Sequence, residues 1–223
     1  MDREIVLQAV QVHKTYKNAF GMNRTAASVG RDLSLYRGET LGLVGSSGSG
    51  KSTMARILLC LTPIDSGKVL FMGEDVNRLD RAKRLDFRKK VQFIAQRPES
   101  FFDPRIKFRK SIKEAVSLLR KSDRYEQELA EWMDRLDLPT GLLDRYPHQI
   151  SGGEIQRLAI CRALMVHPEV IIFDEATSML DVSTQAKIIR LLLEIKKQRE
   201  LTYLFISHDR VLIDKICDRV VEL

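Results

Sequence analysis

The sequence predicts an α/β protein with a covered parallel β-sheet, an antiparallel β-region at its N-terminus and a helical insertion in its middle. Apolar, strand-like segments alternate with helical segments on both sides of the insertion, and such alternation builds a parallel sheet with helices on its faces. The first forty residues instead alternate apolar and polar side chains, as half-buried antiparallel strands do. Residues 97–166 carry helical periodicity and no convincing strand.

Five strands are expected before the insertion. They are EIVLQAVQV (4–12), DLSLYRGE (32–39), TLGLVG (40–45), GKVLFMG (67–73) and KVQFIAQ (90–96). The first two are expected to be antiparallel around a polar excursion over residues 17–30. The third is short and apolar, and it leads into a Gly/Ser loop and a helix predicted from Lys51 to about Leu61.

Apolar residues within the insertion fall on single helical faces. One set is Ile112, Ala115, Val116 and Leu119, and a second is Tyr125, Leu129, Trp132, Met133 and Leu136. After the insertion, strand and helix alternate again. The expected elements are strand VIIFDE (170–175), a helix over 184–197, strand TYLFIS (202–207) and a helix from Asp209.

Composition indicates an ordinary soluble domain of 223 residues, with no apolar run near the roughly 18 residues of a membrane span. The N-terminus lacks a signal-peptide pattern, and the three cysteines read as buried reduced thiols, which favours a cytosolic location. Part of the net charge of +7 lies in residues 78–90. That segment reads either as a solvated helix face with Asp partners or as a surface for acidic lipid headgroups. Nucleic acid is disfavoured, because aromatic residues are not interleaved with the basic ones.

The segment GSSGSGKS predicts a phosphate-binding loop, because it follows a buried strand and opens a helix. Glycines let the backbone wrap phosphate oxygens, and successive N–H groups supply positive potential. Lys51 can bridge the β- and γ-phosphates, and the Ser52 hydroxyl can bind Mg²⁺. A Gly/Ser-rich turn is the alternative. The predicted ATP-binding residues are Gly45, Ser46, Ser47, Gly48, Ser49, Gly50, Lys51, Ser52 and Thr53.

Polar side chains at the ends of three other predicted strands point to chemistry on the bound nucleotide. Asp174 is expected to hold Mg²⁺, and Glu175 to orient or deprotonate the attacking water. His208 can reach the γ-phosphate, and Gln96 can contact Mg²⁺ or that water. The alternatives are a helix-capping acid pair, a structural histidine and a surface glutamine.

A second candidate anion site is ISGGEIQR, at residues 150–157. Ser151 and two glycines open a predicted helix, whose free N–H groups can hold an anion. The set of motifs resembles the ATP-binding subunit of an ABC transporter, in the family's order and spacing. GSSGSGKS matches the Walker A motif, VIIFDE the Walker B motif, ISGGE the ABC signature and SMLD (178–181) the D-loop.

This resemblance implies a P-loop NTPase (RecA-like) core, with an N-terminal antiparallel β-subdomain and an inserted α-helical subdomain. Residues 1–223 would form one ABC ATPase domain, with 1–96 and 167–223 as the core with its β-subdomain and 97–166 as the helical subdomain. Gln96 corresponds to the Q-loop glutamine and His208 to the switch histidine. Tyr16 stands where the family stacks an aromatic ring on adenine.

The resemblance also implies partners. Two subunits pack head to tail around ATP and Mg²⁺, and the signature of each serves the ATP of the other. The signature residues are Ser151, Gly152, Gly153 and Glu154. Asp181 would lie at that interface. Two membrane permeases would dock over residues 96–113, and an extracellular solute-binding protein would take part indirectly. This places the chain at the cytoplasmic face of the cell membrane, without nucleic acid.

Finer likenesses point to the peptide/nickel importer group of this family. They include RPESFFDPR, the residues around the signature, LDVSTQAKIIRLL and the excursion at 19–25. Three residues depart from the usual pattern, Ile150 for leucine, Glu154 for glutamine and Ala176 for proline, and relatives usually continue past CDRVVEL. Glu154 places a negative charge beside a phosphate-binding loop. A soluble ABC ATPase of DNA repair or translation, and a regulator that binds ATP without turnover, are the alternatives. The sequence leaves open the cargo and whether the dimer pairs identical chains.

Overall fold

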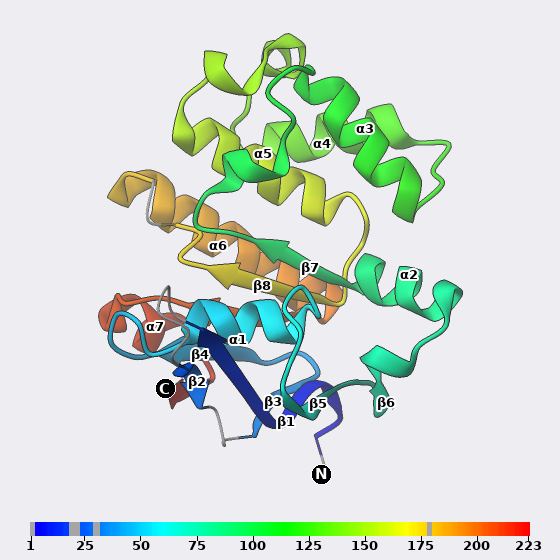
Figure 1. Ribbon diagram of the computed structural model, residues 1–223. Coiled ribbons are helices and arrows are strands. Elements are labelled where there is room, and N and C mark those ends of the chain that lie inside the picture. Colours follow the sequence, from blue (N-terminus) through cyan, green and yellow to red (C-terminus); the bar gives the residue numbers. More distant parts are fainter. Residues whose placement is uncertain (1–2, 18–22, 29–31, 178–179) are drawn as a thin grey trace.

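The computed structural model describes residues 3–17, 23–28, 32–177 and 180–223. Two β-sheets, with helices packed around them, make up this part of the chain (Figure 1). The strands are β1 (Ile5–Lys17), β2 (Asn23–Ser28), β3 (Leu33–Tyr36), β4 (Thr40–Val44), β5 (Ser66–Phe71), β6 (Glu74–Asp75), β7 (Val91–Ile94), β8 (Val170–Asp174), β9 (Thr202–Ile206) and β10 (Arg219–Glu222). The α-helices are α1 (Lys51–Leu58), α2 (Arg81–Lys90), α3 (Phe108–Leu119), α4 (Tyr125–Arg135), α5 (Gly152–Leu164), α6 (Val182–Arg199) and α7 (Arg210–Ile216). Short 3₁₀ turns are η1 (Val76–Arg78), η2 (Pro98–Phe101), η3 (Thr140–Asp144) and η4 (Pro147–Gln149).

The predicted parallel sheet is confirmed, with strand order β10-β4-β9-β8-β7. Every residue of β4, β8 and β9 is buried, because helices or the second sheet cover both faces. Alternate residues of one strand enter different cores. Ile171 and Phe173 pack toward the α5 and α6 side, whereas Val170 and Ile172 pack toward α1 and the antiparallel sheet. The rings of Phe173 and Phe205 stack at 4.4 Å between centroids.

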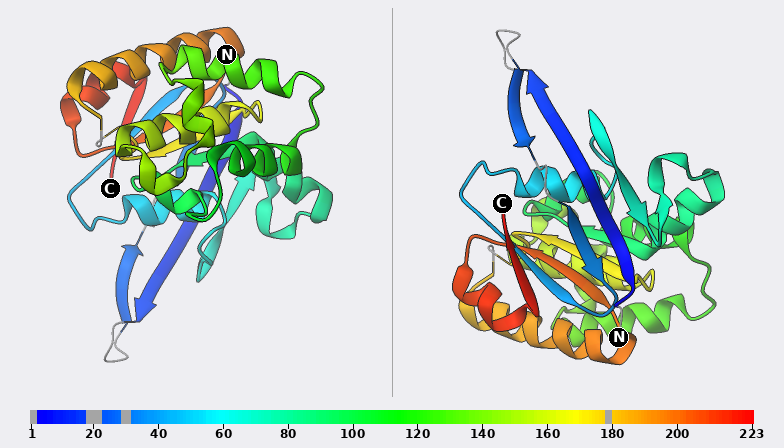
Figure 2. Two further views of the ribbon diagram at one scale, coloured as in Figure 1. Left: turned by 90° about the horizontal axis from the view of Figure 1, so that it is seen from above. Right: turned by 90° about the horizontal axis from the view of Figure 1, so that it is seen from below.

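The antiparallel sheet has the order β2-β1-β5-β6, with β3 also paired to β1. The predicted pairing of the first two strands is confirmed by β1 and β3, which place Leu7 opposite Leu35. The polar excursion expected over residues 17–30 is wrong in part, because residues 23–28 form strand β2. This strand pairs with the second half of β1, which extends past the predicted end at residue 12. The two strands form a hairpin that projects from the rest of the molecule (Figure 2).

The helical insertion is confirmed, since residues 97–166 contain α3, α4, α5 and 3₁₀ turns but no strand. We call residues 98–164 the helical lobe; it lies above the parallel sheet in Figure 1. Its core includes Ile112 and Val116 of α3 and Leu129, Trp132 and Met133 of α4, all at most 4% exposed. The helical spacing of these apolar residues therefore marked the buried faces correctly.

Several smaller expectations are wrong. Helix α1 ends at Leu58 rather than near Leu61, because Leu59 caps it and Cys60 adopts a left-handed backbone with φ of 51°. Cys60 is therefore exposed, whereas Cys161 is buried and Cys217 is half-buried; all three are free thiols. Strands β6 and β10 were not predicted, and β10 forms the edge of the sheet beside β4.

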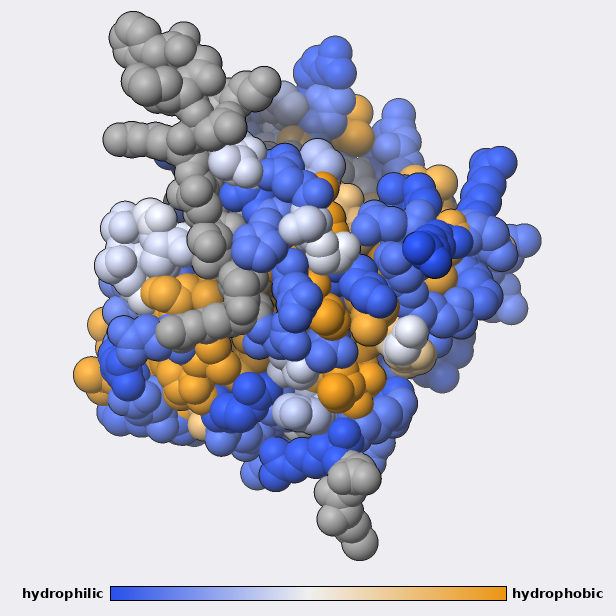
Figure 3. All heavy atoms as spheres, turned by 60° about the horizontal axis from the view of Figure 1, so that its bottom comes forward, coloured by the Kyte–Doolittle hydropathy of each residue, from blue (hydrophilic) through white to orange (hydrophobic). Residues whose placement is uncertain are grey.

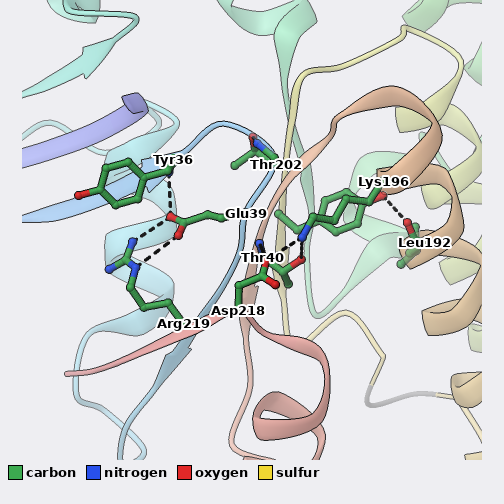
Figure 4. Close-up of polar contacts among 10 residues, drawn as sticks. Tyr36, Glu39, Thr40, Leu192, Lys196, Thr202, Asp218 and Arg219 are labelled. Carbon is green, nitrogen blue, oxygen red and sulfur yellow. Dashed lines mark hydrogen bonds and ion pairs between the residues drawn. The ribbon is translucent and has the colours of Figure 1, made fainter. Parts of the chain in front are cut away.

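A polar network joins the starts of β4 and β10 to helix α6, at the end of the sheet opposite the Gly/Ser loop (Figure 4). The Lys196 ammonium donates to the Thr40 hydroxyl and to the Asp218 carboxylate, each at 2.7 Å. Arg219 pairs with the buried Glu39 carboxylate at 2.8 Å. These contacts fix the start of β4, the strand whose other end leads into the Gly/Ser loop.

Candidate nucleotide-binding site

The Gly/Ser loop follows β4 directly and ends where α1 begins at Lys51. Gly45 has φ of 156°, and a Cβ atom there would lie 2.5 Å from the Leu223 carbonyl oxygen and 2.7 Å from the Ser49 hydroxyl. Gly50 caps the helix with φ of 102°, a backbone conformation that L side chains rarely adopt. The strand, loop and helix that the phosphate-loop pattern requires are therefore all present.

The Lys51 side chain folds back over this loop. Its ammonium donates to the carbonyl oxygens of Gly45 at 2.9 Å and Ser46 at 2.8 Å, and the residue is 7% exposed. The Ser49 hydroxyl is buried and has no hydrogen-bond partner among the described residues. A held cation beside an unsatisfied hydroxyl, at the N-terminus of a helix, suits the oxygens of a phosphate.

Ser52 of α1 and Asp174 at the end of β8 meet, although β9 lies between β8 and β4, the strand that leads into the loop before α1. The Ser52 hydroxyl donates to the Asp174 carboxylate at 3.0 Å. Asp174 is buried, and this burial raises the pKa of its carboxyl above the ordinary value, with the neighbouring charge of Glu175 adding to the effect. Both side chains offer hard oxygen ligands, and a buried carboxylate is stabilised by a cation, so the pair fits Mg²⁺.

Two of the predicted side chains, Gln96 and His208, converge on a third, the carboxylate of Glu175. The Gln96 amide nitrogen donates to Oε2 of Glu175 at 2.8 Å, and His208 Nδ1 lies 3.4 Å from Oε1. They follow the neighbouring strands β7, β8 and β9, whose C-terminal ends share one edge of the sheet. Glu175 adopts φ of 50°, and its N–H donates to the Ile206 carbonyl at 2.9 Å, which fixes the start of its side chain. His208 is 70% exposed at its side chain, so it faces the solvent side of the cluster.

The signature segment opens helix α5, as predicted. Ser151 is the N-cap: its hydroxyl accepts from the Glu154 N–H at 3.3 Å, and it donates to the Glu154 carboxylate at 2.7 Å. The same carboxylate accepts from the Ser151 N–H at 2.8 Å, which completes a capping box. These bonds, with a smaller effect of Arg157, lower the pKa of Glu154.

The signature is not buried in its own fold, because Ser151 and Gly152 are exposed and Gly153 is half-buried. Within the described ranges, no hydrogen bond joins residues 151–154 to residues 45–53. The structure thus joins Ser52 to Asp174, and joins both Gln96 and His208 to Glu175, the residue that follows Asp174. It leaves the signature facing outward.

The remaining predicted residues lie apart from these contacts. Asp181 caps α6 by accepting from the Thr184 N–H at 3.0 Å. Two other residues of the D-loop motif, Ser178 and Met179, lie outside the described residues. The same holds for residues 19–22 of the excursion, and the side chains of residues 23–25 are not described. Tyr16 is on β1 with 38% of its surface exposed, and the Lys14 ammonium lies 5.5 Å from its ring centroid.

Arg162 was not singled out from the sequence. It is a half-buried residue of α5 that donates to the Phe101 carbonyl at 2.8 Å and lies 5.2 Å and 4.9 Å from the ring centroids of Phe101 and Phe102. Burial lowers the pKa of its guanidinium to about 10. Arg162 therefore links the signature helix to the segment that follows Gln96. Two features of the sequence could have pointed to this contact: the adjacent phenylalanines at 101–102, and an arginine among the apolar residues of the later helix.

The site and fold define an α/β nucleoside triphosphatase, in which a Gly/Ser loop between strand and helix lies beside a serine–aspartate pair and a carboxylate held by glutamine and histidine. The family described as ABC transporter matches residues 30–178, and the chain belongs to this family of ATPases. The oligopeptide transport ATP-binding protein OppF of Bacillus subtilis is 42% identical over 93% of this chain and 70% of that protein. OppF of Streptococcus mutans is 39% identical over 98% of this chain and 72% of that protein.

Solved structures agree with this assignment. The dimeric structure of MJ0796, a bacterial ABC transporter cassette, has a TM-score of 0.87 and 28% identity, and the match covers 97% of this chain and 94% of that chain. Within the described part of the chain, none of the helices has the length and apolar character that crossing a bilayer requires. On the face shown in Figure 3, apolar side chains form separate patches among hydrophilic ones.

Proposed function

We propose that this chain is the ATP-binding and hydrolysing subunit of an importer, and that its closure on a second ATP-binding subunit drives peptide uptake through separate permeases. The observation that carries the proposal is the convergence of Gln96 and His208 on Glu175 beside the phosphate loop. The relatives described above are named for oligopeptide transport, so peptides are proposed as cargo in preference to nickel. The same relatives favour transport over a role in DNA repair or translation.

The loop and the two strand-end carboxylates would divide the chemistry. The loop N–H groups, Lys51 and Ser49 would hold the phosphates, and Tyr16 would contact adenine. Ser52 and Asp174, with the amide oxygen of Gln96, would hold Mg²⁺, which neutralises charge on the phosphates when bound. Glu175 would accept a hydrogen bond from the attacking water, and Gln96 supports this role by fixing one carboxylate oxygen.

His208 would donate to the γ-phosphate from the other side of Glu175. Its exposed ring can turn from the Glu175 carboxylate toward a phosphate, because a single contact of 3.4 Å restrains it among the residues that the structure describes. With both carboxylates intact and placed at the strand ends, turnover is favoured over ATP binding without hydrolysis.

The signature would serve the partner's ATP rather than its own. Its exposure, and the absence of a bond to the chain's own loop in the described ranges, support that arrangement. We propose residues 97–166 as the helical subdomain that carries it and residues 1–96 and 167–223 as the ATPase core. Permeases would dock over residues 96–113, next to Arg162, and hold the chain at the cytoplasmic face of the membrane.

Two variants test this proposal. Glu175→Gln should bind ATP and accumulate as a dimer, because hydrolysis no longer removes the bridging γ-phosphate; the measurement is gel filtration with ATP and Mg²⁺. Ser151→Arg should leave ATP affinity of the isolated subunit within about twofold and abolish turnover. Loss of ATP binding by monomeric Ser151→Arg would show that the signature serves the ATP site of its own chain. It would overturn the head-to-tail dimer in which each signature serves the partner's ATP.

A further inference from the structure

Helix α2 presents an exposed surface that the proposed ATPase chemistry does not use. We define the α2 patch as Leu79, Arg81, Arg84, Leu85, Arg88 and Leu118, which together line a shallow hollow. Leu118 comes from α3 of the helical lobe, so the patch bridges the lobe and the sheet. Leu85 is 47% exposed and Leu118 is 74% exposed. Figure 1 shows α2 at the outer side of the molecule, beside β7.

The three arginines of the patch, Arg81, Arg84 and Arg88, form no ion pair with a carboxylate of the described residues. The Asp partners expected for residues 78–90 are present on other cations of the segment, since Asp75 pairs with Arg78 at 3.5 Å and Asp86 with Lys90 at 3.2 Å. Glu74 and Glu169 pair with lysines, at 2.6 Å from Lys83 and 3.2 Å from Lys90. Within the described part of the chain, Arg84 makes only long hydrogen bonds, of 3.4 Å and 3.5 Å, to two carbonyl oxygens.

The pattern of three unpaired arginines around exposed leucines fits the interface of an anionic bilayer. Phosphate headgroups neutralise the guanidinium charges, while the acyl boundary accepts the leucine side chains. A nucleic acid is a poorer match, because the only aromatic residue of α2 is Phe87, which is 3% exposed and cannot stack on a base. An acidic protein segment would satisfy the arginines but leaves the two leucines without an apolar partner.

The place of the patch agrees with this occupant. Arg84 and Arg88 also line the neighbouring cleft that contains Phe101 and Arg162. That cleft adjoins residues 96–113, where the permeases are proposed to dock, so the patch faces the membrane side. We propose that the α2 patch binds anionic phospholipid headgroups beside the permeases; its orientation, though not its charge or exposure, rests on the proposed function.

The test is flotation of the nucleotide-free protein with vesicles of phosphatidylglycerol or of phosphatidylcholine, at low salt. The wild-type chain should float with the anionic vesicles and release as salt shortens the Debye length. The variant Arg81→Gln/Arg84→Gln/Arg88→Gln should bind about a hundredfold more weakly, since each basic residue near such a surface contributes about fivefold. Leu85→Ser/Leu118→Ser should weaken binding without changing its salt dependence.

A matched control removes the same charge elsewhere. Arg190, Lys197 and Lys215 are exposed cations of the groove between α6 and α7. Changing these three to glutamine should weaken flotation only a few-fold. Equal losses in both triple variants, or equal binding to both lipids, would overturn the proposal. Binding to polyglutamate beads but not to vesicles would also overturn it and assign the patch to an acidic protein.

ATP turnover in solution separates this result from the proposed function. The patch variant should hydrolyse ATP at the wild-type rate, because none of its changed residues contacts the nucleotide site. If no form of the chain binds or hydrolyses ATP, the proposed function fails while the flotation result still decides the lipid proposal.

Discussion

Replacing Glu154 with glutamine should strengthen ATP-driven pairing of the subunit. The Ser151 hydroxyl has one hydrogen, and it donates that hydrogen to the Glu154 carboxylate at 2.7 Å. A γ-phosphate from a partner's ATP would need the same hydrogen. Glutamine keeps an oxygen that can accept from the Ser151 N–H, so the helix cap survives, but it removes the negative charge beside the incoming phosphate.

The size of this effect follows from the geometry of the cap. A phosphate oxygen bonded to the Ser151 hydroxyl would lie about 2.7 Å from it, and so at most about 5.4 Å from the carboxylate oxygen, which is itself 2.7 Å away. One pair of unit charges at that distance repels by about 0.8 kcal/mol in water and about 3 kcal/mol at an effective dielectric constant of 20. Glu154 is partly exposed and Arg157 offsets some of its charge, so the lower figure applies. Two such contacts in a dimer give about 1.5 kcal/mol, or about tenfold in the dissociation constant.

The assay is analytical ultracentrifugation of the Glu175→Gln chain with ATP and Mg²⁺, with and without Glu154→Gln. Glu154→Ala is the control, because it removes the charge together with the carboxylate half of the capping box, while the Ser151 hydroxyl can still accept from the N–H of residue 154. A dimer that is unchanged or weaker in Glu154→Gln would refute the reasoning. If neither protein forms a dimer with ATP, the head-to-tail arrangement of identical chains is wrong instead.

Three further outcomes are expected. Lys51→Ala should reduce ATP affinity about tenfold to a hundredfold in calorimetry, since a charged hydrogen bond contributes about 1.5–3 kcal/mol. Asp174→Asn should raise the melting temperature of the nucleotide-free chain near pH 7 and abolish turnover. Because folding raises the pKa of the Asp174 carboxyl, the folded wild-type chain loses stability as pH rises through that folded-state pKa. The gain in melting temperature from asparagine should therefore vanish well below pH 3.8. Hydrogen bonds from Arg120 lower the pKa of Glu128 to about 2 from 4.5, so its stabilisation is present above pH 4.5 and is lost as pH falls toward 2. Urea unfolding should therefore show Glu128→Gln to be less stable than wild type at pH 7 but not at pH 2.

The parallel sheet could be predicted because its strands are buried on both faces and read as continuous apolar runs. β2 could not, since its residues NRTAAS include no large apolar side chain and the strand forms by pairing with the extended second half of β1. β10 was missed for a related reason: its four residues become a strand by pairing with β4, which lies some 180 residues earlier in the chain. The local pattern of apolar and polar residues does not predict pairing between segments that lie apart in the chain.

The proximity of the candidate site residues could be predicted because their motifs lie at strand ends, and parallel strands bring those ends together. The sequence placed Ser52, Asp174, Gln96 and Glu175 at one edge of the sheet, and the structure joins them in the pairs Ser52–Asp174 and Gln96–Glu175. Which atoms meet could not, and neither could Arg162, whose role depends on the packing of α5 against η2. The capping bond between Ser151 and Glu154 was foreseeable from their spacing.

The helical lobe is connected to the parallel sheet at one edge, between the strands β7 and β8. Its chain leaves immediately after β7, which has ladder hydrogen bonds to β8 alone in the described sheet, and returns just before β8. A force on the lobe therefore acts at one end on an edge strand, which is hydrogen-bonded on one side, and at the other end on β8, which is paired on both sides. Gln96 would travel with the lobe, while the Glu175 backbone stays anchored to Ile206. We therefore expect force on the lobe to lengthen the 2.8 Å bond between Gln96 and Glu175, and so to alter the surroundings of this carboxylate.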